Sequence, residues 1–136
     1  MIRKIVHDQM LLRMPSEPAT KADLPIGEDL KDTLEENLGS CVGMAANMIG
    51  ERRRIIVIAS GYARFVMYNP VITAKKDPFE AEEGCLSLPG TRKTIRYKEI
   101  TVQYQDERFV KHTGVYRSWT AQIIQHEIDH CNGILI

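Results

Sequence analysis

The sequence lacks long apolar runs, and its few cysteines do not form a disulfide framework. Its 136 residues contain no stretch like the ~20 apolar residues of a membrane-spanning helix. The charged N-terminus also lacks the apolar core of a signal peptide. The three cysteines, Cys41, Cys85 and Cys131, are odd in number and irregularly spaced. We therefore expect a cytoplasmic protein without a membrane partner, whose thiols are free or metal-bound.

An excess of charge of one sign is also missing. The chain has 18 basic and 18 acidic residues, which argues against a broad nucleic-acid-binding face and a specific nucleic-acid partner. The triplet Arg52-Arg53-Arg54 is a local exception, but a solvated turn before a strand is the simpler interpretation. With no repeat and no linker, residues 1–136 are expected to form a single domain.

The spacing of apolar residues indicates an α+β fold. Residues 1–27, rich in proline, are expected to be extended and irregular. The expected helices cover residues 29–38 and 119–131, and the expected strands cover 55–58, 65–68, 71–74, 100–104, 109–110 and 114–116. Asn69-Pro70 should end the strand at 65–68, because proline cannot donate to a strand ladder. Asn132-Gly133 suits the end of the last helix.

The most informative segment is His126-Glu127-Ile128-Asp129-His130. Residues four apart lie on one face of a helix, so the two histidines can bind one metal ion. Glu127 follows the first histidine and can take a proton from the attacking water. A surface helix whose histidines bind nothing is the alternative interpretation.

A catalytic metal site needs a third protein ligand and an open position for water. His7 and His112 lie in unremarkable surroundings. Cys85 instead lies in a distinctive segment, where Gly84 permits a sharp turn and Pro89 stiffens the exit. From the residues alone, Cys85 remains either an inert packed cysteine or the missing ligand.

Two segments of the chain together resemble signature motifs of the peptide deformylase family. These are Glu83-Gly84-Cys85-Leu86-Ser87 and Gln125-His126-Glu127-Ile128-Asp129-His130, about 40 residues apart and in this order. Ile5-Val6-His7-Asp8 and Asn69-Pro70 also resemble the family, so the likeness covers essentially the whole chain. The resemblance implies antiparallel strands wrapped around a central helix that carries the HExxH motif.

The resemblance also implies a reaction and its residues. The family removes the formyl group from the N-terminal formyl-methionine of new bacterial proteins, using one divalent metal ion per chain. The implied ligands are Cys85, His126 and His130, with Fe²⁺ in the cell and Zn²⁺ or Ni²⁺ as replacements. Glu127 is the implied general acid–base, and the backbone N–H of Leu86 an implied oxyanion donor.

The same resemblance implies where the formylated peptide binds. The methionine pocket would be formed around Val42, Gly43, Trp119 and Ile123, together with Gln122 and His126. Trp119 and Gln122 are bulkier or more polar than a plain methionine pocket requires.

The first family motif, Gly-x-Gly-x-Ala-Ala-x-Gln, is degenerate in this chain. Cys41 replaces its first glycine, and Met48 replaces the glutamine whose amide donates to the oxyanion in the family. A thioether cannot donate a hydrogen bond. Loss of one oxyanion donor typically lowers the rate by about 10²–10³. Weakened activity is therefore expected unless Asn47 supplies the missing amide.

Two alternatives stay open at this point. Besides a deformylase with weakened activity, the chain could be a deformylase-like amidase with a different N-acyl substrate, or a non-catalytic descendant that binds peptides. Glu127 argues against the second, because a binding protein has no need of that base. Many family members continue into a C-terminal helix associated with ribosome docking, and its absence after Ile136 puts that partner in doubt.

Overall fold

The computed structural model describes residues 1–136 and contains one five-stranded antiparallel sheet. The elements are α1 (Gln9–Leu12), a 3₁₀ turn (Lys21–Asp23), α2 (Leu24–Glu36), β1 (Gly43–Ala45), a second 3₁₀ turn (Ala46–Ile49), β2 (Ile55–Ser60), β3 (Ala63–Cys85), β4 (Leu88–Gln105), β5 (Lys111–Arg117) and α3 (Ser118–Cys131). The strands lie in the order β1-β2-β3-β4-β5, so each pairs with its neighbours in the sequence.

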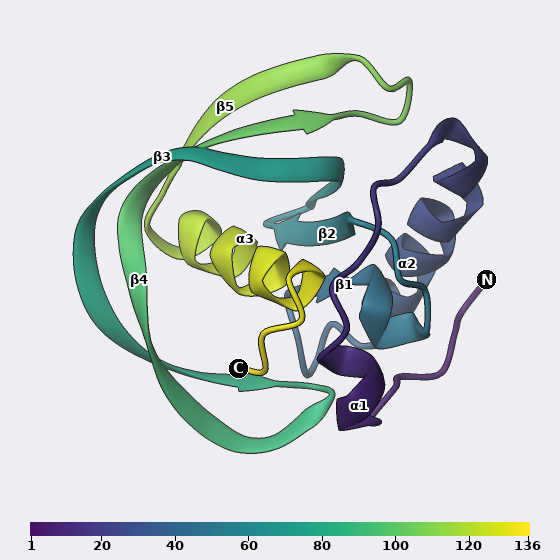
Figure 1. Cartoon of the computed structure of the whole chain (residues 1–136), viewed down its shortest axis with the longest axis horizontal. Helices are drawn as coiled ribbons and strands as arrows, with labels where there is room; N and C mark the ends of the chain where they lie inside the picture. The colour runs from purple at the N-terminus through teal and green to yellow at the C-terminus, as the bar shows by residue number, and fades with distance from the viewer.

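The two longest strands, β3 and β4, curve around α3, which lies inside the arc that they form (Figure 1). Their pairing contains three register shifts, at Tyr68/Val71, Ile72/Ala74 and Gly84/Cys85. An extra residue on one strand bends the ladder and increases its twist, which lets long strands wrap around a helix. The expected α+β fold, with antiparallel strands around a central helix, is therefore confirmed.

The prediction that Asn69-Pro70 ends a strand is wrong. β3 runs through both residues, which lie at the register shift between Tyr68 and Val71. At a bulge the missing proline N–H removes no ladder hydrogen bond. Asn69 has a positive φ of 54°, and its side chain exchanges two hydrogen bonds with the backbone of Ala19. The Asn-Pro pair therefore bends the strand and holds the N-terminal segment against it.

Three further expectations are corrected at the ends of elements. Residues 1–27 are not wholly irregular, because Asp8 caps α1 and α2 already begins at Leu24, with a proline in its first turn as helices tolerate. Residues 109–110 are not a strand but belong to the turn between β4 and β5, where Asp106 accepts from two backbone N–H groups. Gly84 lies within β3, and the sharp turn is Leu86-Ser87 instead.

The core lies on both faces of β2. Ile55 and Val57 pack into an apolar cluster with residues of α2, whereas Ile56 and Ile58 pack into a second cluster with residues of α3. A strand buried on both faces has an unbroken apolar sequence rather than an alternating one. The run Ile55–Ile58 therefore places β2 between the two helices.

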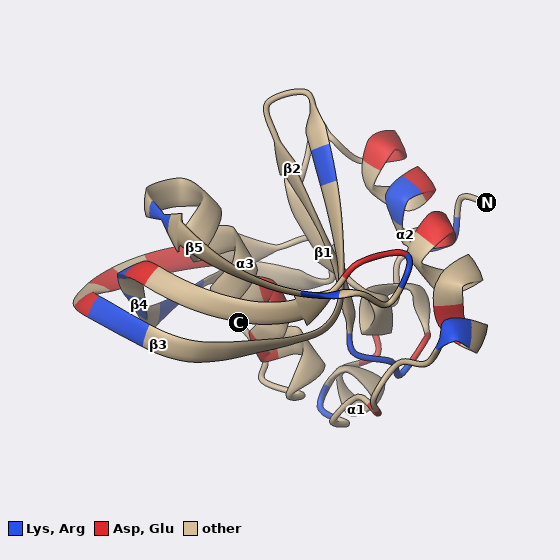
Figure 2. Cartoon of the chain, turned by 90° about the horizontal axis from the view of Figure 1, so that it is seen from above, with Lys and Arg blue, Asp and Glu red and all other residues tan.

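The surface carries charges of both signs. Figure 2 shows Lys and Arg interspersed with Asp and Glu along α2, β3 and β4. The arginine triplet forms contacts within the chain: Arg52 donates to the carbonyl of Pro15, Arg53 lies 3.5 Å from Asp23, and Arg54 donates to Asn132. A search of the helices for a bilayer-spanning segment finds none.

Gly27 is required where α2 meets β3. A Cβ atom at this position would lie 2.0 Å from the hydroxyl oxygen of the buried Tyr68. We expect Gly27→Ala to lower the free energy of unfolding by about 1–3 kcal/mol, although alanine favours helices, because overpacking displaces the tyrosine. Urea denaturation followed by circular dichroism measures this. Gly39→Ala is the control, since no atom lies within 4 Å of its Cβ position; equal stability of the two variants would contradict the argument.

Candidate metal centre and active site

Three side chains from the end of β3 and from α3 converge on one point. The sulfur of Cys85 lies 3.2 Å from Nε2 of His130, and that atom lies 3.2 Å from Nε2 of His126. All three ligand atoms lie within 4.8 Å of one another. A tetrahedral ion with ordinary Zn–S and Zn–N bond lengths keeps its donor atoms roughly 3.3–3.6 Å apart. The donor set therefore fits a single transition-metal ion, with Cys85 half-buried and both histidines buried.

The rings of the two histidines are oriented for binding through Nε2. Nδ1 of His126 lies 2.9 Å from Oε1 of Glu83, so its Nε2 faces the cluster. Burial alone would lower the pKa of His126, but hydrogen bonds with Cys85 and Glu83 outweigh it and raise the pKa to about 10. Burial and the charge on His126 lower the pKa of His130 to about 3. A metal ion bound here would displace the proton on His126, because metal binding at ionisable ligands releases their protons.

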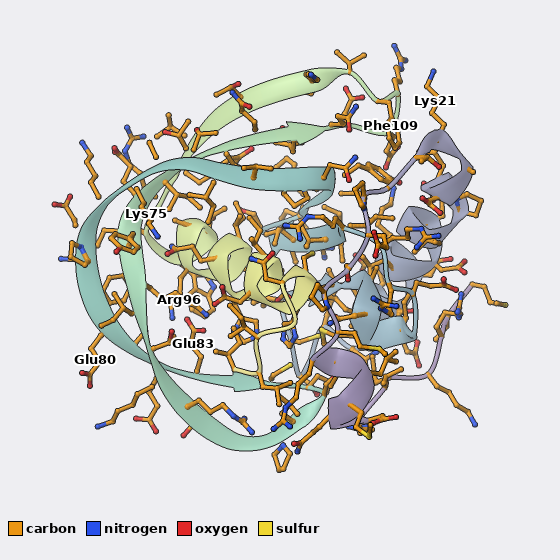
Figure 3. The ribbon with its side chains drawn as sticks, in the orientation of Figure 1. Lys21, Lys75, Glu80, Glu83, Arg96 and Phe109 are labelled. Carbon is orange, nitrogen blue, oxygen red and sulfur yellow. The ribbon has the colours of Figure 1, made fainter.

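Glu83 holds the first histidine and is itself held by two other side chains. Arg96 of β4 donates to both carboxylate oxygens, and Gln122 of α3 donates to Oε2 at 2.9 Å. In Figure 3, Glu83 and Arg96 point toward α3 from β3 and β4, whereas Glu80 points to solvent. Although burial alone would raise it, hydrogen bonds from these neighbours and from His126 keep the pKa of Glu83 at about 2.

Sequence reasoning missed this supporting network. The motif around Cys85 contains Glu83 but does not indicate its function, and no local motif contains Arg96. Arg96 is 3% exposed and also bonds Asp129 of α3 at 2.6 Å. On a strand of alternating residues, an arginine is ordinarily taken for the solvent face, so the pattern of β4 contained no signal for its burial.

Glu127 lies beside the ligands with an unused oxygen. Its side chain is buried, and Oε1 has no hydrogen-bond partner in the protein. Burial raises its pKa to about 7, although the neighbouring charge on His126 opposes this. A buried carboxylate oxygen without a partner is costly unless water or a ligand reaches it. Glu127 is therefore poised to accept a hydrogen bond from a molecule at the metal centre.

Gly43 lets β1 approach α3 closely at this site. A Cβ atom on Gly43 would lie 2.6 Å from a methyl carbon of Ile123 and 2.9 Å from Oε2 of Glu127. Any larger residue would therefore displace either a pocket wall or the carboxylate.

A pocket of about 760 Å³ opens onto the metal centre. Its size lies within the usual range of small-ligand sites, roughly 300–1,000 Å³. The four residues predicted to bind substrate all line it: Val42, Gly43, Trp119 and Ile123. Trp119 is 60% exposed and lies at the rim, whereas Ile123 is buried.

The two predicted oxyanion positions from the first motif point to different places. Met48 lines the pocket, and its sulfur accepts from the backbone N–H of Ala45 at 3.5 Å. Asn47 is buried outside the pocket and donates to the carbonyl oxygen of His130 at 2.9 Å. Leu86 follows Cys85 in the turn, lines the pocket, and its N–H takes part in none of the backbone hydrogen bonds of turns and loops.

Comparison with known proteins agrees with this geometry. The sequence profile of the polypeptide deformylase family matches residues 2–136. A peptide deformylase of Clostridium beijerinckii is 53% identical over 136 residues, covering 100% of both chains, and one of Chlorobaculum tepidum is 37% identical, covering 95% of this chain and 74% of its own. The crystal structure of peptide deformylase from Thermotoga maritima superposes with a TM-score of 0.89 at 30% identity, covering 99% of this chain and 95% of its own. A Met-Ala-Ser-bound class I type b peptide deformylase from Acinetobacter baumannii gives a TM-score of 0.89 at 26% identity, covering 99% and 97%.

The ligand cluster predicts the metal content of the protein. We expect about one divalent transition-metal ion per chain by elemental analysis, because the three donor atoms together form a single metal site. Cys85→Ser should weaken the affinity by at least ~10-fold in chelator competition, since even changes beyond the ligands cost roughly 10–100-fold. Cys41→Ser, which alters a thiol in the same pocket outside the cluster, should retain the metal. Unchanged affinity in Cys85→Ser would refute the assignment.

Proposed function

The chain belongs to the polypeptide deformylase family, and we propose that it removes the formyl group from the N-terminal formyl-methionine of newly made proteins. As a member of the family it is a metal-dependent amide hydrolase acting on N-formyl peptides. The observation that best supports the proposal is the unpartnered oxygen of Glu127 beside the ligand cluster, at the base of the pocket. Hydrolysis needs a base at this place, whereas binding alone does not.

Cys85, His126 and His130 would hold the metal, with Fe²⁺ as the ion in the cell and Zn²⁺ or Ni²⁺ as replacements. A bound divalent ion would supply Lewis acidity at the attacking water and at the formyl oxygen. A thiolate ligand lowers the net charge of the site and exposes it to oxidation. The Glu83 carboxylate keeps Nε2 of His126 turned toward the other two ligand atoms, where a metal ion would be held.

The side chains around the metal centre would carry the proton transfers. Glu127 takes the proton of the attacking water and returns it to the amine of the leaving peptide, because no other carboxylate in the pocket has a buried, unpartnered oxygen. The free N–H of Leu86 donates to the oxygen of the former formyl group as negative charge develops on it. Val42, Gly43, Trp119 and Ile123 would receive the methionine side chain.

Met48 is the reason that we propose a lowered catalytic efficiency. Its thioether occupies the pocket wall where the family motif places an amide donor, and it cannot donate. Asn47 is an unfavourable substitute, because its amide would have to leave the carbonyl of His130. We therefore infer weakened turnover that depends mainly on the metal, Glu127 and the Leu86 N–H.

The missing oxyanion donor at Met48 is also compatible with two other functions. A deformylase-like amidase with a different N-acyl substrate would have its oxyanion supported in another way, and a non-catalytic peptide-binding protein would need no donor at all. The unpartnered oxygen of Glu127 favours turnover over binding alone. A cytoplasmic location suits both the free cysteines and a nascent-peptide substrate.

Glu127→Gln separates metal binding from catalysis. The amide is nearly isosteric but cannot accept the proton, so we expect formate release from formyl-Met-Ala-Ser to fall by ~10²-fold or more. Metal content should stay at the wild-type level, because Glu127 is not among the ligands. Anaerobically prepared, iron-loaded protein gives the reference rate. Equal rates in the two proteins would show that Glu127 has only a structural function.

Met48→Gln tests the missing oxyanion donor. The new amide carbon would take the place of the sulfur near the Ala45 N–H, so its carbonyl can accept from Ala45 while its NH₂ group points onward. We expect kcat on formyl-Met-Ala-Ser to rise roughly 10-fold, with a smaller change in KM, because the donor acts mainly in the transition state. Met48→Leu is the control that adds no donor. If Met48→Gln and Met48→Leu release formate at the same rate, the oxyanion argument fails.

A further inference from the structure

We propose that Gln122 is a specificity-determining residue that presents one hydrogen-bond acceptor to the first side chain of the peptide. The pocket would then admit, besides methionine, formyl peptides whose first side chain ends in an N–H or O–H donor. This inference rests on the proposed function, because it assumes that the pocket receives that side chain.

The orientation of the Gln122 amide follows from its partner. Its nitrogen lies 2.9 Å from Oε2 of Glu83, and a carboxylate can only accept hydrogen bonds. Arg96 also donates to both oxygens of this carboxylate, so Oε2 already acts as an acceptor. The NH₂ group of Gln122 must therefore face Glu83, which turns its carbonyl oxygen the other way.

The carbonyl oxygen is left without a partner in the protein. The bond to Glu83 is the one side-chain hydrogen bond that Gln122 makes, and the residue is half-buried in the pocket wall. Its neighbours in the wall formed by α3 are the apolar Trp119 and Ile123 and the ligand His126. Since the bond to Glu83 fixes the amide, the oxygen is an oriented acceptor that water or a substrate donor must satisfy.

Methionine cannot provide such a donor, because its thioether only accepts. Glutamine has nearly the same length and ends in an NH₂ group. Met-Ala-Ser and Gln-Ala-Ser are therefore a matched pair of product peptides that differ in what they offer to Gln122. Pairing an acceptor that the bound peptide covers, instead of leaving it unpaired, changes affinity by roughly 5–100-fold.

The test measures the ratio of the two dissociation constants by calorimetry, in wild type and in Gln122→Met, which removes the acceptor at similar volume. We expect the variant to shift the ratio toward Met-Ala-Ser by at least ~10-fold. Any disturbance of Glu83 or His126 affects both peptides alike and cancels in the ratio. Gln122→Ala repeats the test with a smaller side chain, and Gln103→Leu, at an exposed position of β4, should leave the ratio unchanged.

The corresponding formyl peptides distinguish the two levels of the argument. Suppose that formate is released from formyl-Met-Ala-Ser, but the ratio of the two dissociation constants is unchanged in both Gln122 variants. This result would overturn only the inference on Gln122 and leave the proposed function intact. No formate release from this peptide would overturn the proposed function. If neither product peptide binds, the pocket does not receive the side chain, and the inference on Gln122 is overturned as well.

Discussion

The buried ion pair between Glu83 and Arg96 is the interaction on which the site depends. It joins β3 to β4, and its further contacts with His126, Gln122 and Asp129 join both strands to α3. A buried ion pair gains little stability over apolar packing, since both charges lose their water. Its benefit here is orientation, because the same carboxylate fixes the ring of a metal ligand. The fold therefore places its costliest buried charges where position matters most.

The curvature of the sheet and the chemistry of the site have a common origin. Register shifts bend β3 and β4 around α3, and one of them lies between Gly84 and Cys85, at the ligand itself. Bulges commonly occur beside active sites because they redirect a side chain. At the same pocket, Gly43 lets β1 come into contact with Ile123 and Glu127. Both β3 and β1 therefore contact α3 around the pocket, and Oε1 of Glu127 is buried there.

Sequence reasoning was strongest where spacing alone determines position. The histidines of α3 share a face because the helix has 3.6 residues per turn, and the apolar run of β2 reports burial on both faces. It failed where a residue's meaning depends on distant partners. Asn69-Pro70 predicts a strand end from the local sequence, but it lies at a bulge where Asn69 bonds the distant Ala19. The burial of Arg96 depends on Glu83 and Asp129, which no local pattern predicts.

The two carboxylates of the site show how environment divides their functions. Glu83 is surrounded by donors from Arg96, His126 and Gln122, so its pKa falls to about 2 and it stays a fixed anion. Glu127 lies a short distance away without a donor to Oε1, and burial raises its pKa to about 7. Carboxylates whose pKa values are driven apart in this way can serve as anchor and as proton acceptor. The number of donors that each carboxylate receives therefore separates the residue that orients the metal ligand from the residue that moves the proton.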